Sequence, residues 1–259
     1  MRPEKPVSER FGLVKGDGWD GMAIDLGALS LNQARACVPE FSRTGLRGLL
    51  TAFPRTIEEL RPALHLPKNI GSPYVIVVGQ VMPIRLDDMV PVIRQWLAMS
   101  TEEGVPIQFE THRNCITNDL YTMLQLIDLI PEMRLSADLS HYVVDREMMQ
   151  PITAEYQGMV RKILLRSDSF QGRVATRNQV QVPIGFPQNQ VWLNTLIDWW
   201  TFDLAAWKAR SRQDDEVIFL SELGPSEYAI TGADGNELSD RRQEALTLRQ
   251  IAADIWDNL

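Results

Sequence analysis

Short apolar runs and longer amphipathic segments alternate along the whole chain. Seven of the apolar runs have the length of a β-strand, and several are apolar at nearly every position rather than at every second one. Continuous runs of this kind are typical of parallel strands buried on both faces, because a strand with one wet face alternates apolar with polar residues. The pattern predicts strands at 21–26, 46–53, 74–80, 106–110, 134–139, 170–176 and 217–222.

The segments between these runs have apolar residues at the spacing of a helix with one buried face. In the last of them Leu248, Ala252 and Ile255 recur at this spacing, and Ser239 is the expected N-cap. A strand followed by a helix, repeated along the chain, predicts an α/β protein with a mostly parallel sheet. The expected helices are 30–42, 56–64, 87–103, 118–129, 151–166, 189–210 and 240–257.

Two architectures fit this alternation, a doubly wound open sheet and a closed barrel. A dinucleotide-binding open sheet would carry a glycine-rich fingerprint after its first strand, and no strand here is followed by one. Polar and acidic residues instead follow several strands, where barrels keep their active sites. We therefore expect a (β/α)8 TIM barrel, formed as a single domain over residues 1–259. Since only seven strands are counted, the first strand is expected to be lacking or irregular.

Composition and charge narrow the compartment and the partners. The 259 residues are 44% hydrophobic, carry a formal net charge of −8 and include two cysteines. We found no basic stripe that would track nucleic acid, and no run of about 18 apolar residues that would span a membrane. The first sixteen residues lack the apolar core of a signal peptide. These features predict a cytoplasmic protein that binds neither nucleic acid nor membranes.

Side chains able to do chemistry gather where four of the predicted strands end. Carboxylates occur at three of these ends, and the fourth carries an amide and a guanidinium two residues apart. Because three converging carboxylates repel one another, a cation is expected among them, and oxygen ligands suit Mg²⁺ or Mn²⁺. Taken singly, a glutamate at a strand end is more often a rim salt bridge, and a histidine is more often structural. The residues concerned are Glu110, His112, Arg113, Asp138, His141, Gln171, Arg173 and Glu222.

Four short motifs resemble the xylose-isomerase-like TIM-barrel superfamily, and more narrowly its sugar phosphate isomerase/epimerase branch. They are E-T-H-R at 110–113, D-L-S-H at 138–141, G-R-V at 172–174 and E-L-G-P at 222–225. The first two are fairly specific together at their observed separation. The resemblance covers most of the chain, from Trp19 to the C-terminal helix.

The resemblance implies a divalent metal and assigns a role to most of the motif residues. It implies that His141 and Arg173 contact the substrate. His112 and Arg113 continue the first motif into the loop and would line the same pocket. At position 171 the chain has glutamine where relatives have a metal-binding histidine, and an amide oxygen is a weaker ligand for transition metals. The implied metal ligands are Glu110, Asp138, Gln171 and Glu222, of which Glu110 and Glu222 would also move the proton.

The expected function is therefore a metal-dependent isomerase or epimerase that acts on a sugar or sugar phosphate by proton transfer through an enediolate. The alternative is a catalytically degenerate barrel that binds a small ligand or a partner without turnover, which Gln171 favours. A third interpretation, a phosphodiesterase of the endonuclease type, is opposed by the negative net charge and by a total of three histidines.

Two further features bear on assembly and on access to the site. The helix predicted at 189–210 carries four tryptophans, which indicate core packing or an interface in a homodimer. The loop at 177–188 follows a site strand and is either a lid or an ordered rim segment. The tryptophans are Trp192, Trp199, Trp200 and Trp207.

Overall fold

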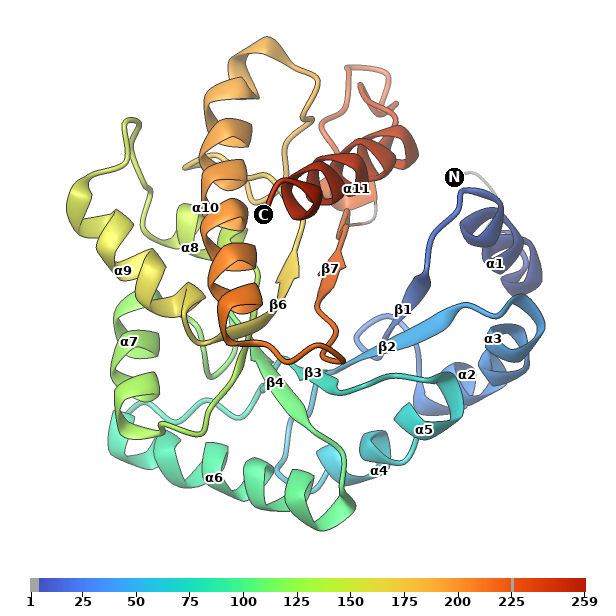
Figure 1. Cartoon of the computed structure of the whole chain (residues 1–259), viewed down its shortest axis with the longest axis vertical. Coiled ribbons are helices and arrows are strands. Elements are labelled where there is room, and N and C mark those ends of the chain that lie inside the picture. The colour runs from blue at the N-terminus through green and yellow to red at the C-terminus, as the bar shows by residue number, and fades with distance from the viewer. Residues whose placement is uncertain (1–4, 225) are drawn as a thin grey trace. The chain divides into compact units, whose positions relative to one another are not determined.

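The computed structural model describes residues 5–224 and 226–259 (Figure 1). The chain divides into two compact units, Met1–Phe109 and Glu110–Leu259, and each is described by itself below. Pro225, the last residue of the E-L-G-P motif, lies outside the described residues. The assignment of the whole chain to a single domain stays a prediction.

The first unit is built on four parallel strands in chain order. Residues 21–25 pair in register with residues 47–51. Val75–Val77 pairs with residues 107–109. Most of these side chains are buried, as expected for strands that are apolar throughout. The strands are β1 (Gly21–Asp25), β2 (Arg47–Ala52), β3 (Val75–Val77) and β4 (Ile107–Glu110).

Helices flank these strands, and two of the predicted helices differ in the structure. The helix expected at 56–64 begins only at Leu60. The helix expected at 30–42 is two helices that meet at Cys37. Pro39 explains the break, because its ring has no N–H to donate and clashes with the preceding turn of a continuous helix. The helices are α1 (Val7–Gly16), α2 (Leu31–Ala36), α3 (Val38–Thr44), α4 (Leu60–Leu64), α5 (Pro67–Ile70) and α6 (Leu86–Glu103).

The second unit has three parallel strands, again in chain order. Ala137 of β5 lies opposite Phe170 of β6, and Phe170 lies opposite Phe219 of β7. Figure 1 shows α10 beside β6. The strands are β5 (Leu135–Ala137), β6 (Ser167–Gln171) and β7 (Ile218–Leu220), and the helices are α7 (Leu120–Leu129), α8 (Leu139–Asp145), α9 (Ala154–Leu164), α10 (Gln190–Arg210) and α11 (Arg241–Asp257).

All seven predicted strands are present among the described residues, but three local predictions in the second unit were wrong. β6 begins three residues earlier than expected and ends at Gln171, so Arg173 lies beyond the strand. Asp138 is the N-cap of α8, a helix that the sequence pattern did not reveal. The N-cap of α11 is Asp240 rather than Ser239, since its carboxylate accepts from the N–H groups of Arg242 and Gln243.

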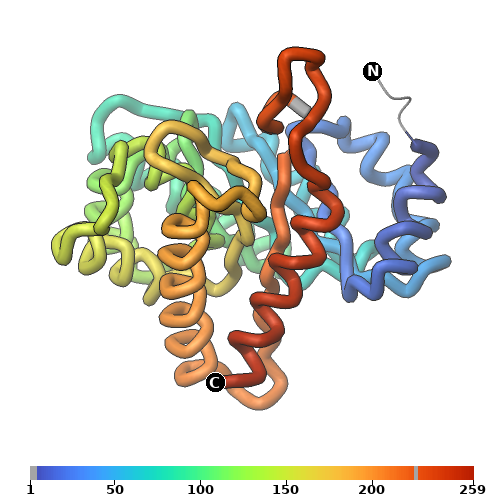
Figure 2. The backbone as a smooth tube through the Cα atoms, turned by 90° about the horizontal axis from the view of Figure 1, so that it is seen from above, coloured from blue at the N-terminus to red at the C-terminus, as the bar shows by residue number. Residues whose placement is uncertain are grey.

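The tryptophans of α10 pack inside the chain. All four are buried, and α11 runs alongside α10 (Figure 2), where Trp256 lies 6.1 Å from Trp207 between ring centroids. The prediction of a homodimer relied on exposed apolar area along this helix, and that area is already covered. Oligomeric state stays a prediction. None of the helices in the described part of the chain is long and apolar enough to cross a bilayer.

Candidate active site

Glu110 is the last residue of β4 and is almost completely buried. The following residue, Thr111, holds this end of the strand: its N–H donates to Ser136 O over 3.1 Å, and its hydroxyl donates to Asp138 O over 2.7 Å. The hydroxyl of Thr117 donates to the carbonyl of Glu110. These bonds link the backbone of the E-T-H-R motif to β5 and to the start of the D-L-S-H motif.

Asp138 is fully buried and follows β5 directly. One carboxylate oxygen, Oδ1, caps α8 by accepting from the N–H of Ser140 over 2.9 Å. The other, Oδ2, lies 3.3 Å from Arg173 Nη1 and 3.4 Å from His141 Nε2. Neither contact has hydrogen-bond geometry, so Oδ2 is a buried acceptor that no donor satisfies among the described residues.

Arg173 connects the third motif to the fourth. One of its terminal nitrogens donates to the carboxylate of Glu222, and its Nε lies 3.5 Å from the Glu222 carbonyl. The guanidinium carbon lies 5.6 Å from the centre of the Tyr228 ring. The residue before it is glycine because a Cβ at position 172 would overlap the ring of Phe219. Arg173 therefore follows a position at which glycine leaves room for the Phe219 ring of β7.

The predicted carboxylates meet in space. Glu110, Asp138 and Glu222 each offer a possible ligand atom, and these atoms lie within 4.8 Å of one another. Gln171 lies in the same place: its amide hydrogen-bonds to Glu110 and approaches Ser136 Oγ at 3.5 Å. Its carbonyl oxygen is buried and has no donor in the described part of the chain.

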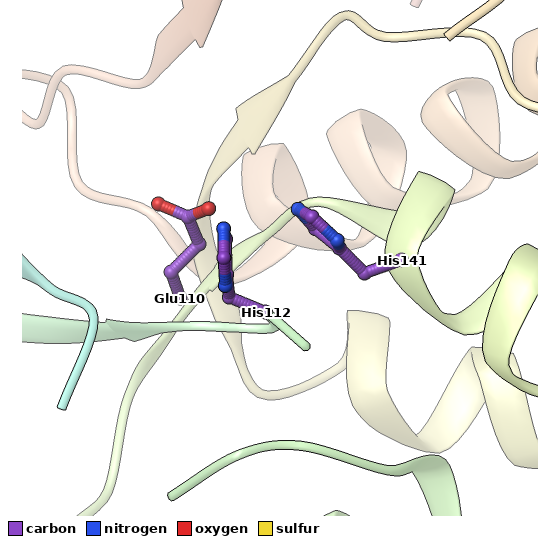
Figure 3. Close-up of side chains that lie close together, drawn as sticks. All are labelled: Glu110, His112 and His141. Atoms are coloured by element: carbon purple, nitrogen blue, oxygen red, sulfur yellow. The ribbon is translucent and has the colours of Figure 1, made fainter. Parts of the chain in front are cut away.

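Two histidines extend this cluster on one side. Figure 3 shows the His112 ring standing between the Glu110 carboxylate and the His141 ring. The two rings lie 4.0 Å apart between centroids at an interplanar angle of 47°. Glu110, His112 and His141 form a second group with ligand atoms within 4.8 Å of one another. All seven residues that the resemblance assigns to metal or substrate thus lie in one cluster within the second unit.

Burial and neighbouring charges set the protonation states of the cluster. Burial, and then the carboxylates of Glu222 and Asp138, raise the pKa of Glu110 well above its ordinary value. Burial lowers the pKa of His112, and it lowers the pKa of His141 well below its ordinary value, so His141 is neutral near pH 7. Burial alone would lower the pKa of Arg173, but the surrounding carboxylates raise it, so this guanidinium stays charged.

The donor set fits a hard divalent cation. Two buried oxygens, Asp138 Oδ2 and Gln171 Oε1, have no hydrogen-bond donor among the described residues, and an unsatisfied buried acceptor is costly unless something outside the chain binds it. The carboxylate group supplies oxygens only, which suits Mg²⁺ or Mn²⁺. Cys115, although nearby, is no nucleophile, because burial raises the pKa of its thiol to about 11.

A pocket of about 430 Å³ lies beside the cluster. Arg113 from the E-T-H-R motif lines it, together with residues of the loop that was expected to be a lid or a rim. The residues of this loop that line the pocket were not identified from the sequence, since no motif marks them. The lining residues are Arg113, 179–181 and 227–230.

No protein-family profile matches the chain. No curated protein matches it in sequence. Solved structures match it over nearly its whole length. A xylose isomerase-like TIM barrel protein from Mycobacterium smegmatis, in complex with magnesium, has a TM-score of 0.64 at 12% identity, with 98% of this chain and 91% of that chain covered.

Two further structures carry names from sugar chemistry. A D-allulose 3-epimerase from a Methylomonas species, in complex with D-allulose, has a TM-score of 0.60 at 14% identity and covers 96% of this chain and 90% of its own. A sugar phosphate isomerase/epimerase from Parabacteroides distasonis has a TM-score of 0.58 at 8% identity, with coverage of 96% and 88%.

The chain has the TIM-barrel fold of these structures. The fold class predicted from the strand pattern and the four motifs is confirmed, with seven strands in the described part of the chain. At identities this low the likeness establishes the fold, whereas the reaction depends on the side chains of the cluster.

Proposed function

We propose that this protein is a metal-dependent isomerase or epimerase of sugars or sugar phosphates. The observation that carries the proposal is the group formed by Glu110, Asp138 and Glu222, whose possible ligand atoms lie within 4.8 Å of one another. Glu110 is buried and Glu222 is partly exposed, so these two carboxylates have the unlike surroundings that an acid and a base require. The shared fold with a D-allulose 3-epimerase and a sugar phosphate isomerase/epimerase supports the same chemistry.

The cation would be held by Glu110, Asp138, Gln171 and Glu222. When bound, Mg²⁺ or Mn²⁺ would polarise neighbouring carbonyl and hydroxyl oxygens of the sugar and lower the free energy of the enediolate. Arg173 and His112 would orient the sugar, and neutral His141 would exchange a hydrogen bond with one of its hydroxyl groups.

Two glutamates would move the proton. Glu222 is partly exposed and paired with the Arg173 guanidinium, so it would take the proton from the carbon next to the carbonyl. Glu110, which is buried beside the other two carboxylates, would return a proton to the enediolate. Return to the original carbon from the other face gives an epimer, and return to the neighbouring carbon gives an aldose–ketose isomer.

Exchange of substrate hydrogen with solvent tests the proposal across many sugars at once. The full chain is incubated in D₂O with Mn²⁺ and a panel of ketoses, aldoses and their phosphates, and deuterium at the carbon next to the carbonyl is followed by NMR. Glu110→Gln and Glu222→Gln should each lower exchange and turnover by about 10²- to 10⁴-fold. Glu155→Gln, at an exposed position on α9, is the matched control. Near-normal exchange in both site variants would reject the assignment.

A second function, ligand binding without turnover, is favoured by the position of Arg173. Its guanidinium already lies against Asp138 and Glu222 and neutralises part of their charge. Gln171 is also a weaker ligand than the histidine that relatives have. Calorimetric titration with Mn²⁺ separates the two candidates. Stoichiometric binding that is weakened in Glu222→Gln supports the enzyme, and absence of binding up to millimolar Mn²⁺ supports the degenerate barrel.

A further inference from the structure

The pocket beside the carboxylate cluster has a wall rich in hydrogen-bond donors. Arg113 is half-buried in this wall, and among the described residues its guanidinium makes no hydrogen bond and no ion pair. A partly buried guanidinium without a partner keeps its full capacity for a planar, bidentate oxyanion. The resemblance places Arg113 at the pocket but assigns it no contact with the metal or the substrate.

Gln181 adds donors to the same wall. It is buried, and its side-chain oxygen is used internally, since it accepts from the N–H of Gly224 over 2.6 Å. This bond fixes the orientation of the amide, so the side-chain NH₂ group is the part that remains for a ligand. The exposed amide of Gln179 and the ring of Tyr228 complete this part of the lining.

One acidic residue, Glu227, also lines the pocket. It is exposed, whereas Arg113 is half-buried, and no ion pair joins the two in the described part of the chain. A charge in contact with water is screened more strongly than one that is partly buried, so Glu227 offsets the charge of Arg113 less than a buried carboxylate would.

The pocket adjoins the proposed site of proton transfer. Tyr228 lines the pocket, and its ring lies 5.6 Å from the guanidinium carbon of Arg173, which binds Glu222. On the other side, Arg113 directly follows His112, whose ring nitrogen Nδ1 contacts the carbonyl of Arg113. A ligand that reaches from the carboxylates into the pocket would therefore bring its far end to Arg113.

We propose that Arg113 and Gln181 bind an anionic terminal group of the substrate, either phosphate or carboxylate, and so select acidic sugars over neutral ones. The inference rests on the proposed function, because it names the substrate class of the same site. It makes Arg113 a residue that determines specificity, at a distance from the carbons where the proton moves.

Calorimetry with matched ligands tests this proposal. The full chain with Mg²⁺ is titrated with D-fructose and D-fructose 6-phosphate, and separately with D-glucose and D-glucuronate. We expect at least one anionic ligand to bind roughly tenfold more tightly than its neutral counterpart. A preference for fructose 6-phosphate assigns the pocket to phosphate, and a preference for glucuronate assigns it to carboxylate.

Four variants show which side chain gives the preference. Arg113→Gln should reduce it to less than twofold, Arg113→Lys should retain part of it, and Glu227→Gln should increase it. Arg177→Gln is the matched control, because Arg177 has the same charge nearby but pairs with Glu147 over 3.0 Å. A preference that survives Arg113→Gln, equal affinity for neutral and anionic ligands, or failure of both anionic ligands to bind would each overturn the proposal.

Turnover of the same four ligands keeps this inference separate from the proposed function. Preferential binding of an anionic ligand that depends on Arg113, without turnover of any ligand, would uphold the pocket and count against the isomerase. Turnover of fructose or glucose without any preference for the anionic partner would uphold the isomerase and reject the role of Arg113.

Discussion

The guanidinium of Arg173 donates a hydrogen bond to the carboxylate of Glu222, a residue 49 positions later in the chain. The same guanidinium lies 3.3 Å from Asp138, so a single cation is shared by two of the three clustered carboxylates. Arg173 is therefore the internal counter-charge of the site.

Replacing Arg173 by glutamine should destabilise the metal-free protein and make it depend more on added cation. Removal of one partner from a buried ion pair costs about 3 kcal/mol or more, because the other charge stays buried without compensation. Denaturant unfolding with and without Mn²⁺ measures both effects, and Mn²⁺ should stabilise Arg173→Gln more than the unmodified protein. Arg173→Lys, which keeps the charge, is the control. Equal stabilisation of all three proteins by Mn²⁺ would contradict the idea.

Replacing Gln171 by histidine should change which cation the site prefers. Imidazole is a better ligand than an amide for transition metals and offers little to Mg²⁺. We expect the ratio of Mn²⁺ to Mg²⁺ affinity to rise by roughly tenfold, which is about 1.4 kcal/mol. Calorimetric titrations with each cation give the ratio. Gln171→Leu, which removes the ligand oxygen, should weaken both cations, and an unchanged ratio in Gln171→His would show that position 171 does not face the metal.

A methyl group at position 172 should destabilise the protein. The Cβ of Gly172→Ala would overlap the ring of Phe219. This ring packs edge-to-face against Trp200, with 5.2 Å between the ring centroids. Overpacking of this kind costs about 1 to 3 kcal/mol, as thermal or denaturant unfolding would measure. The double variant with Phe219→Leu tests the cause. If the double variant is as unstable as the sum of the two single variants, the ring is not the source of the clash.

Asp203 on α10 should make the protein less stable as pH rises. Its carboxyl is fully buried, neither oxygen has a hydrogen-bond partner among the described residues, and burial raises its pKa well above the ordinary 3.8. Between the unfolded and the folded pKa the folded chain keeps a proton that the unfolded chain has lost. The free energy of unfolding therefore falls with rising pH in that window, by up to about 1.4 kcal/mol per pH unit.

The variant Asp203→Asn isolates this effect, because its side chain is nearly the same shape and does not titrate. Its stability relative to the unmodified protein should rise from pH 4 upward and level off above the folded pKa. Urea unfolding at a series of pH values provides the measurement, with Asp198→Asn on the same helix as a control. A difference that stays constant across the series would mean that Asp203 is not protonated in the folded protein.

The strand pattern was predictable because a strand buried on both faces is apolar at nearly every position, as in residues 74–80. β6 was misplaced for a physical reason: it begins with Ser167, Asp168 and Ser169, which are polar although the two serines are buried, and the apolar residues of 174–175 lie beyond its end. The signal of α8 was also weak, since a helix of seven residues that starts after Asp138 shows hardly two turns of periodicity.

The carboxylates of the site were predictable because each follows a strand, and parallel strands bring their carboxyl ends together. The contacts that complete the site were not predictable in the same way. Two hydrogen bonds join positions that are far apart in the chain, and no spacing rule connects those positions. They pair Arg173 with Glu222 and Gln181 with Gly224. Only the three-dimensional path of the loops places Tyr228 beside Arg173.

The pocket wall comes mainly from loop residues, whereas the carboxylates lie at or just beyond strand ends. Loops accept substitutions that strands do not, so Gln179 and Glu227 can vary without moving Glu110 or Asp138. Proteins with this fold could therefore change their substrate through substitutions in the loops, while the carboxylates that would transfer the proton stay the same. Natural variants of this protein should accordingly diverge first at the pocket, and libraries that seek new substrates should be randomised there.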